Sequence, residues 1–70
     1  MFTGVCKFWN SSRGYGFLTA DDDGKDYFIH ATCVERSGLH QLVRDQKVSF
    51  TVKEDLKTNR VKVDHVRLII

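Results

Sequence analysis

A side-chain period of two runs through almost the whole chain and restricts it to β structure. Short apolar and aromatic runs alternate with polar residues, and glycine- or aspartate-rich turn segments separate them. We predict five strands, over Phe2–Asn10, Tyr15–Ala20, Asp26–His30, about Lys47–Lys53, and Arg60 to about Ile69. Three strands, a long connection and two more strands fit an all-β fold, a closed five-stranded antiparallel barrel.

The segments between the strands carry the turn signals. Asp21–Gly24 predicts a hairpin loop because Asp-Gly is a strong turn step, and Asp55–Asn59 predicts a second hairpin. The segment Ala31–Asp45 has no clear period. Within it Thr32–Glu35 suits one helical turn, and the rest is a long connection between the two parts of the barrel.

The last predicted strand has two irregular features. Its apolar positions change parity between Val63 and Val66, which predicts a β-bulge. Its tail, Leu68–Ile70, is apolar where small domains usually fray. These residues either close the core or form an edge that pairs with a second chain. We expect a monomer, with a dimer through this strand as the alternative.

Length and composition limit what the chain can be. Seventy residues form one small domain, 1–70, and an apolar share of 41% is that of a globular chain. A formal net charge of +2 is too small to attract polyanions by itself, so nucleic-acid binding requires a local basic patch. No apolar run approaches the ~20 residues of a membrane span. No leader precedes Phe2, so we expect a cytoplasmic protein without membrane contact.

The sequence predicts no metal, cofactor or catalysis. Cys6 and Cys33 are expected to be reduced, small core residues, and together with the three histidines they show no metal-ligand spacing. Asp21–Asp23 lacks the alternate carboxylates of a calcium loop. We find no nucleophile–base pair, no paired carboxylates in an apolar setting and no phosphate-cradling loop, so we do not expect an enzyme.

Two neighbouring predicted strands place aromatic rings on one face. Tyr15 and Phe17 lie two residues apart, and so do Phe28 and His30, so each pair points to one side of its strand. The glycines that flank Tyr15 would let a ligand lie close to the backbone. Rings that stack on bases, edged by cations that follow phosphates, are what single-stranded nucleic acid requires.

These rings could instead belong to the core. However, the same strands supply a second apolar set for the interior, Leu18, Tyr27 and Ile29, and a small barrel cannot bury both faces. We therefore favour rings at the surface. His30 could be a satisfied polar residue at a strand end; beside Phe28 we favour stacking.

The cations next to the rings are candidate phosphate contacts. Lys7 and Arg13 flank the rings and are expected to contact phosphates. The alternative is that both are ordinary solvated side chains. Cations in or near turns are expected to be ordinary solvated side chains, although we retain Arg60 as a candidate phosphate contact. His40, in the long connection, is an open alternative that we also retain.

Three blocks of sequence lie in these strands: Lys7-Phe8-Trp9-Asn10, Arg13-Gly14-Tyr15-Gly16-Phe17-Leu18 and Asp26-Tyr27-Phe28-Ile29-His30. They resemble the K-W-F-N, K-G-F/Y-G-F-I and D-V-F-V-H motifs of the cold-shock domain family. The match spans essentially the whole chain, and the three blocks at this spacing are highly specific. The resemblance implies an oligonucleotide-binding (OB) barrel that binds single-stranded RNA and DNA, with members that act as RNA chaperones and antiterminators in the bacterial cytoplasm.

The chain departs from the family pattern at several stacking positions. Phe8 and Trp9 reverse the usual W-F order. The family stacks a base on the first of the two, here Phe8, whereas strict alternation puts Trp9 with Lys7 on the opposite face. The sequence leaves open which ring contacts a base. Ala31 and Leu39 stand where the family has further aromatics, so two stacking positions are weakened.

The predicted function is sequence-tolerant binding of single-stranded RNA or DNA, with pyrimidine-rich strands preferred and weak secondary structure melted. The alternative is a protein-interaction module that uses the apolar tail. The candidate nucleic-acid contacts are Lys7, Phe8, Trp9, Arg13, Tyr15, Phe17, Phe28, His30, Leu39, His40 and Arg60.

Overall fold

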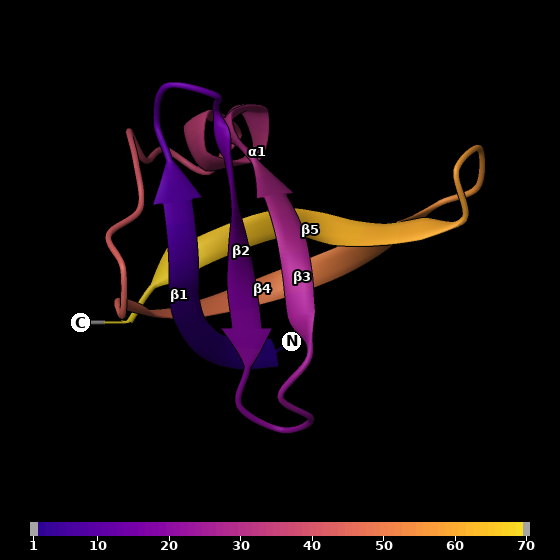
Figure 1. Cartoon of the computed structure of the whole chain (residues 1–70), viewed down its shortest axis with the longest axis horizontal. Helices are drawn as coiled ribbons and strands as arrows, with labels where there is room; N and C mark the ends of the chain where they lie inside the picture. Colours follow the sequence, from indigo (N-terminus) through magenta and orange to yellow (C-terminus); the bar gives the residue numbers. More distant parts are fainter. Residues whose placement is uncertain (1, 70) are drawn as a thin grey trace.

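The computed structural model describes residues 2–69 and forms a closed barrel of five strands with one short helix (Figure 1). The elements are β1 (Phe2–Asn10), β2 (Tyr15–Ala20), β3 (Asp26–His30), α1 (Ala31–Arg36), β4 (Lys47–Asp55) and β5 (Arg60–Leu68). The predicted all-β barrel is confirmed. Among the described residues, no helix has the length and apolar character needed to cross a membrane.

The strands follow the order β1-β2-β3-β5-β4 around the barrel. The contacts β1–β2, β2–β3, β1–β4 and β4–β5 are antiparallel, whereas β3 and β5 pair in parallel at Phe28 and Lys62. Antiparallel alternation cannot be completed around a ring with an odd number of strands, so one contact must be parallel. That contact brings the start of β5 beside the middle of β3.

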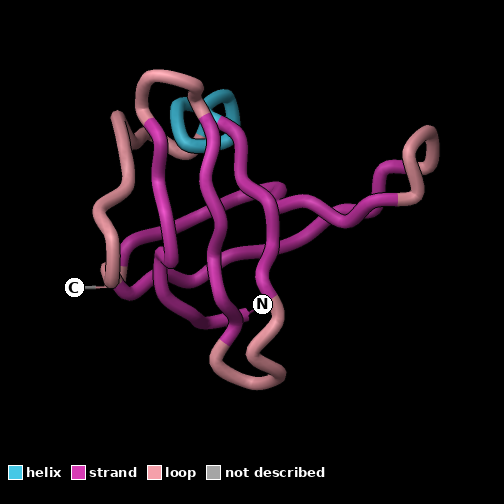
Figure 2. Tube along the Cα trace, viewed as in Figure 1, coloured by secondary structure: helices cyan, strands magenta, loops and turns pink. Residues whose placement is uncertain are grey.

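The inward positions of the strands and one face of α1 form the core. The helix lies over one end of the barrel (Figure 2) and extends the predicted helical turn by one residue at each end. Both cysteines are free thiols in this core, as expected. The buried core residues are Cys6, Leu18, Ala20, Ile29, Cys33, Val34, Leu42, Val48, Phe50, Val63 and Val66.

The predicted bulge in β5 is confirmed. Thr51 pairs with His65 and Val52 pairs with Val63, so Asp64 is the extra residue. This insertion allows both Val63 and Val66 to face the core despite their odd spacing.

The tail divides between core and surface. Leu68 packs against the core, whereas Ile69 is 45% exposed and its N–H donates to the Lys47 carbonyl. Ile70 lies outside the described residues. Leu68 therefore acts as a core-closing residue.

The β4–β5 hairpin projects from the barrel as an arm (Figures 1 and 2). Pairing continues out to Asp55 and Arg60, two residues beyond the predicted end of β4. Leu56 at the tip is 83% exposed, and Asn59 takes a left-handed backbone conformation, which asparagine tolerates. The base of this arm lies next to β3.

Candidate nucleic-acid interface

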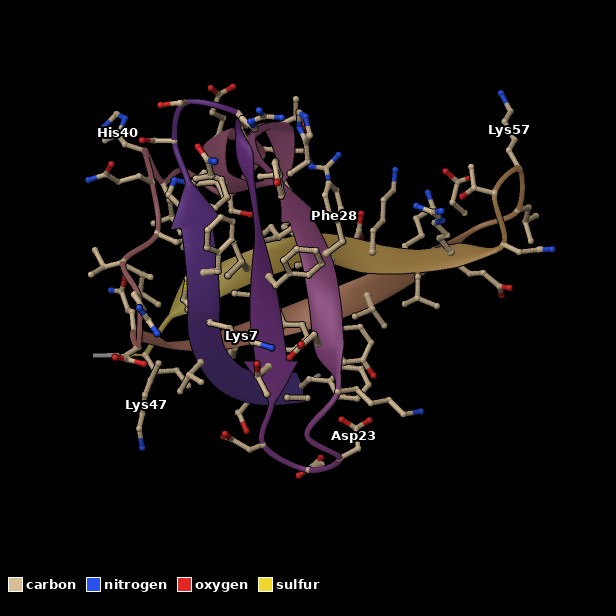
Figure 3. The ribbon with its side chains drawn as sticks, viewed as in Figure 1. Lys7, Asp23, Phe28, His40, Lys47 and Lys57 are labelled. Atoms are coloured by element: carbon tan, nitrogen blue, oxygen red, sulfur yellow. The ribbon has the colours of Figure 1, made fainter. Side chains whose placement is uncertain are left out.

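The outer surface of β2 and β3 carries a contiguous group of rings. Tyr15 pairs with His30 and Phe17 pairs with Phe28, so strand alternation puts all four side chains on one face. The Tyr15 and Phe28 rings stack at 5.9 Å, Phe17 meets Phe28 edge-on at 5.9 Å, and Phe28 lies 6.3 Å from His30. Figure 3 shows Phe28 on the near side of the barrel. The preference for surface rings over core rings therefore agrees with the geometry.

A bulge in β1 decides the orientation of Phe8. Cys6 pairs with Leu18 and Phe8 with Phe17, which leaves Lys7 as an extra residue. As a result Lys7 and Phe8 are both exposed on the outer surface, and the Phe8 ring lies 6.0 Å from Tyr15. The expectation that strict alternation separates Lys7 from Phe8 is wrong because of this bulge. We call Phe8, Tyr15, Phe17, Phe28 and His30 the outer aromatic face.

Trp9 turns inward instead. It is half-buried and packs against the core, and its indole Nε1 is buried without a hydrogen-bond partner among residues 2–69. A side chain at Gly16 would overlap the Phe8 carbonyl oxygen and approach Cε3 of Trp9 to 2.8 Å. Gly16 thus accommodates Trp9 rather than a ligand, which corrects the role expected for that glycine. Trp9 contributes no ring to the outer aromatic face.

His30 has a structural contact as well as a place among the rings. Its Nδ1 accepts a hydrogen bond from the Thr32 N–H at 3.1 Å and so caps α1. In this arrangement Nδ1 is the acceptor, so the cap occupies that ring nitrogen. His30 is therefore a satisfied polar residue at the strand end and also a member of the ring cluster, while base stacking on it stays a prediction.

The predicted cations occupy different surroundings. Lys7 forms an ion pair with Asp26, with Nζ 2.7 Å from Oδ2. Arg13 is exposed in the turn before β2, where its backbone N–H donates to Asn10 Oδ1. Arg60 is exposed at the start of β5. Lys7 is thus already engaged within the protein.

A groove of about 540 Å³ runs between the rings and the hairpin arm. Phe17 and Phe28 line one side of it, and Arg60, Val61 and Lys62 line the other. Lys62 is not among the contacts predicted from the sequence. The strand period indicated which way Lys62 points, but nothing in the sequence reveals that β5 closes against β3.

The two candidates in the long connection are not part of this surface. Leu39 is half-buried against the core, with its N–H donating to the Val34 carbonyl, so it does not join the outer aromatic face. His40 is exposed, and Figure 3 shows it beyond β1, away from Phe28. Both residues lie off the ring surface because the connection packs along the barrel, and their contact with nucleic acid stays a prediction. In residues 2–69 there is no group of three His, Cys, Asp or Glu side chains that could hold a metal.

A closed barrel of five strands in this order is the architecture of the oligonucleotide-binding fold. The family model described as the 'Cold-shock' DNA-binding domain matches residues 2–69. The chain is therefore a member of the cold-shock domain family, whose domains bind nucleic acid.

Similar proteins agree with this assignment. The chain is 40% identical over 67 residues to "Cold shock protein CspA" of Rhizobium meliloti (strain 1021), an alignment that covers 96% of this chain and 97% of the relative. It is 41% identical over 61 residues to a "Cold shock-like protein" of Aquifex aeolicus (strain VF5), with 87% of each chain covered. It is 38% identical over 52 residues to "Cold shock-like protein CspG" of Escherichia coli (strain K12), with 74% of each covered.

Proposed function

We propose that this chain binds single-stranded RNA and DNA with little sequence preference by stacking bases on the outer aromatic face. The observation that carries the proposal is the unbroken contact of five rings across three strands. These rings lie at the surface, and the Phe8 side chain is 42% exposed. A base stacked on an aromatic side chain contributes about 1–3 kcal/mol, and every base has a ring face to offer.

The mechanism is competition without a chemical step. A base that stacks on the protein cannot pair, so binding traps open strands and destabilises weak hairpins. This activity suits an RNA chaperone or a transcription antiterminator acting as a monomer in the cytoplasm. Pyrimidine-rich strands should bind best because their bases stack weakly on one another and leave their neighbours easily.

Cations on two sides of the rings support binding of the phosphates. Arg13 lies at one end of β2, and Arg60 and Lys62 line the groove along the arm. Within residues 2–69 no carboxylate pairs with any of the three. Three phosphate contacts predict a log–log salt slope of about −2 for a single strand.

The test is a fluorescence-anisotropy titration of labelled oligo-dT and oligo-dA of matched length at several salt concentrations. We expect tighter binding of oligo-dT and a slope near −2. A hairpin with a weak stem should open as the protein is added. Absence of binding to either oligomer, or a slope near zero, would contradict the proposal.

A further inference from the structure

The outer surface of β2 and β3 continues past the rings with one polar pair. Thr19 pairs with Asp26 directly after the Phe17–Phe28 pair, and alternation places both on the same face as the rings. Lys7, the bulged residue of β1, reaches across to this pair, and Figure 3 shows its side chain running over β2 towards β3. We call Lys7, Thr19 and Asp26 the polar rung.

Both oxygens of the Asp26 carboxylate are occupied. Lys7 Nζ donates to Oδ2 at 2.7 Å, and Thr19 Oγ1 donates to Oδ1 at 2.7 Å. These two hydrogen bonds, the one from Lys7 first, lower the pKa of Asp26 below its ordinary value. The carboxylate is therefore fully ionised at neutral pH, and it holds the Lys7 ammonium in place.

The position of Asp26 makes this ion pair relevant to binding. Its carboxylate lines the groove that Phe17 and Phe28 also line. The loop between β2 and β3, which ends directly before Asp26, carries the three exposed carboxylates of Asp21–Asp23. The same loop carries one exposed cation, Lys25, and Arg13 and Arg60 lie elsewhere around the rings, so carboxylates outnumber cations at the loop end.

We propose that Asp26 limits nucleic-acid affinity by withholding Lys7 from the phosphates and by closing the loop end of the outer aromatic face to the strand. This inference rests on the proposed function. A phosphate that approaches Lys7 must displace a carboxylate already bound there, so the exchange of one anion for another adds little affinity. The bound strand is directed towards Arg13 and the arm, and it is released more readily.

The experiment compares Asp26→Asn with Asp22→Asn in oligo-dT titrations at several salt concentrations. Both substitutions remove one negative charge from the same end of the barrel. Asp22 is exposed and makes no side-chain hydrogen bond within residues 2–69, so it is the matched control. At Asp26 the amide keeps an oxygen for Thr19 but frees Lys7.

We expect Asp26→Asn to bind oligo-dT about fivefold more tightly than Asp22→Asn at ~0.1 M salt, with a slope steeper by about 0.7, the values for one additional phosphate contact. Adding Lys7→Met to Asp26→Asn should remove this gain. Lys7→Met alone should leave the salt slope of the wild-type protein unchanged. Melting curves of each variant establish that it is folded.

The outcomes separate the two proposals. If the wild type binds but the two asparagine variants have equal affinity and slope, the role of Asp26 is wrong and the proposed function stands. A weaker-binding Asp26→Asn variant would also overturn it, since the carboxylate would then be a contact. If neither the wild type nor a variant binds oligo-dT, the proposed function itself fails.

Discussion

The barrel contains two groups of aromatic rings that differ in surroundings rather than in residue type. In the inner group Phe2, Tyr27 and Phe50 lie 5.6–5.7 Å apart, and Phe50 is 1% exposed. The outer aromatic face has similar ring spacings but lies at the surface. Tyr27 and Phe28 are neighbours in sequence and belong to different groups. Strand parity therefore decides whether a ring stabilises the fold or remains available to a ligand.

The largest effect that tests this comparison is expected at the centre of the inner group. Phe50→Ala removes a fully buried ring from a small core and should lower the free energy of unfolding by about 3–5 kcal/mol. In a 70-residue chain this is enough to unfold much of the population. Urea denaturation followed by circular dichroism measures the change. A loss below about 1 kcal/mol would mean that the inner rings do not carry the core.

The neighbouring pair Tyr27 and Phe28 gives a sharper comparison. Phe28→Ala should weaken oligo-dT binding by about 1–3 kcal/mol while the β spectrum is kept. Tyr27→Ala should mainly lower the melting temperature, because Tyr27 packs against the core. Phe17→Ala should behave like Phe28→Ala. Unfolding of both outer-face variants, with no folded species of reduced affinity, would place their rings in the core.

Much of this arrangement could be predicted from the sequence because it depends on local period. The strand boundaries agree to within two residues, and the odd spacing of Val63 and Val66 predicts the β5 bulge. The alternation of Tyr15, Phe17 and Phe28 against Leu18 and Ile29 assigns rings to the outside and aliphatic residues to the core.

The remaining features depend on how segments meet across the barrel. The bulge at Lys7 is hidden because Phe8 and Trp9 are both aromatic, so the apolar pattern fits either register. The closeness of Lys62 to Phe28 follows from parallel closure, and the ion pair of Lys7 with Asp26 spans three strands. Leu39 was expected at the interface by resemblance alone, and its packing against the core was not visible in the local pattern.

The packing of Trp9 on Gly16 gives a prediction that involves both the core and the outer aromatic face. Gly16→Ala introduces a methyl group that overlaps the Phe8 carbonyl and crowds Trp9. We expect a loss of about 1–3 kcal/mol in the free energy of unfolding, because overpacking forces shifts in backbone and side chains. Binding should weaken as well, since β1 carries Phe8. Thermal melting and oligo-dT titration measure the two effects, and unchanged values in both would show that β1 and β2 are not closely packed there.

The smallest expected effect concerns Asp26 and pH. Because its pKa is lowered in the folded protein, by Lys7 first and Thr19 second, its ionised form stabilises the fold above the ordinary aspartate pKa. That contribution is lost as pH falls through the lowered folded pKa, below about 4. The carboxylate is exposed, so the change in melting temperature is modest. The difference in melting temperature between the wild type and Asp26→Asn should therefore be present at pH 7 and shrink towards pH 3. Asp22→Asn, which removes an exposed carboxylate without these two hydrogen bonds, is the matched control. If the melting temperatures of both variants changed with pH in parallel, the hydrogen bonds of the polar rung would not stabilise the ionised Asp26 carboxylate.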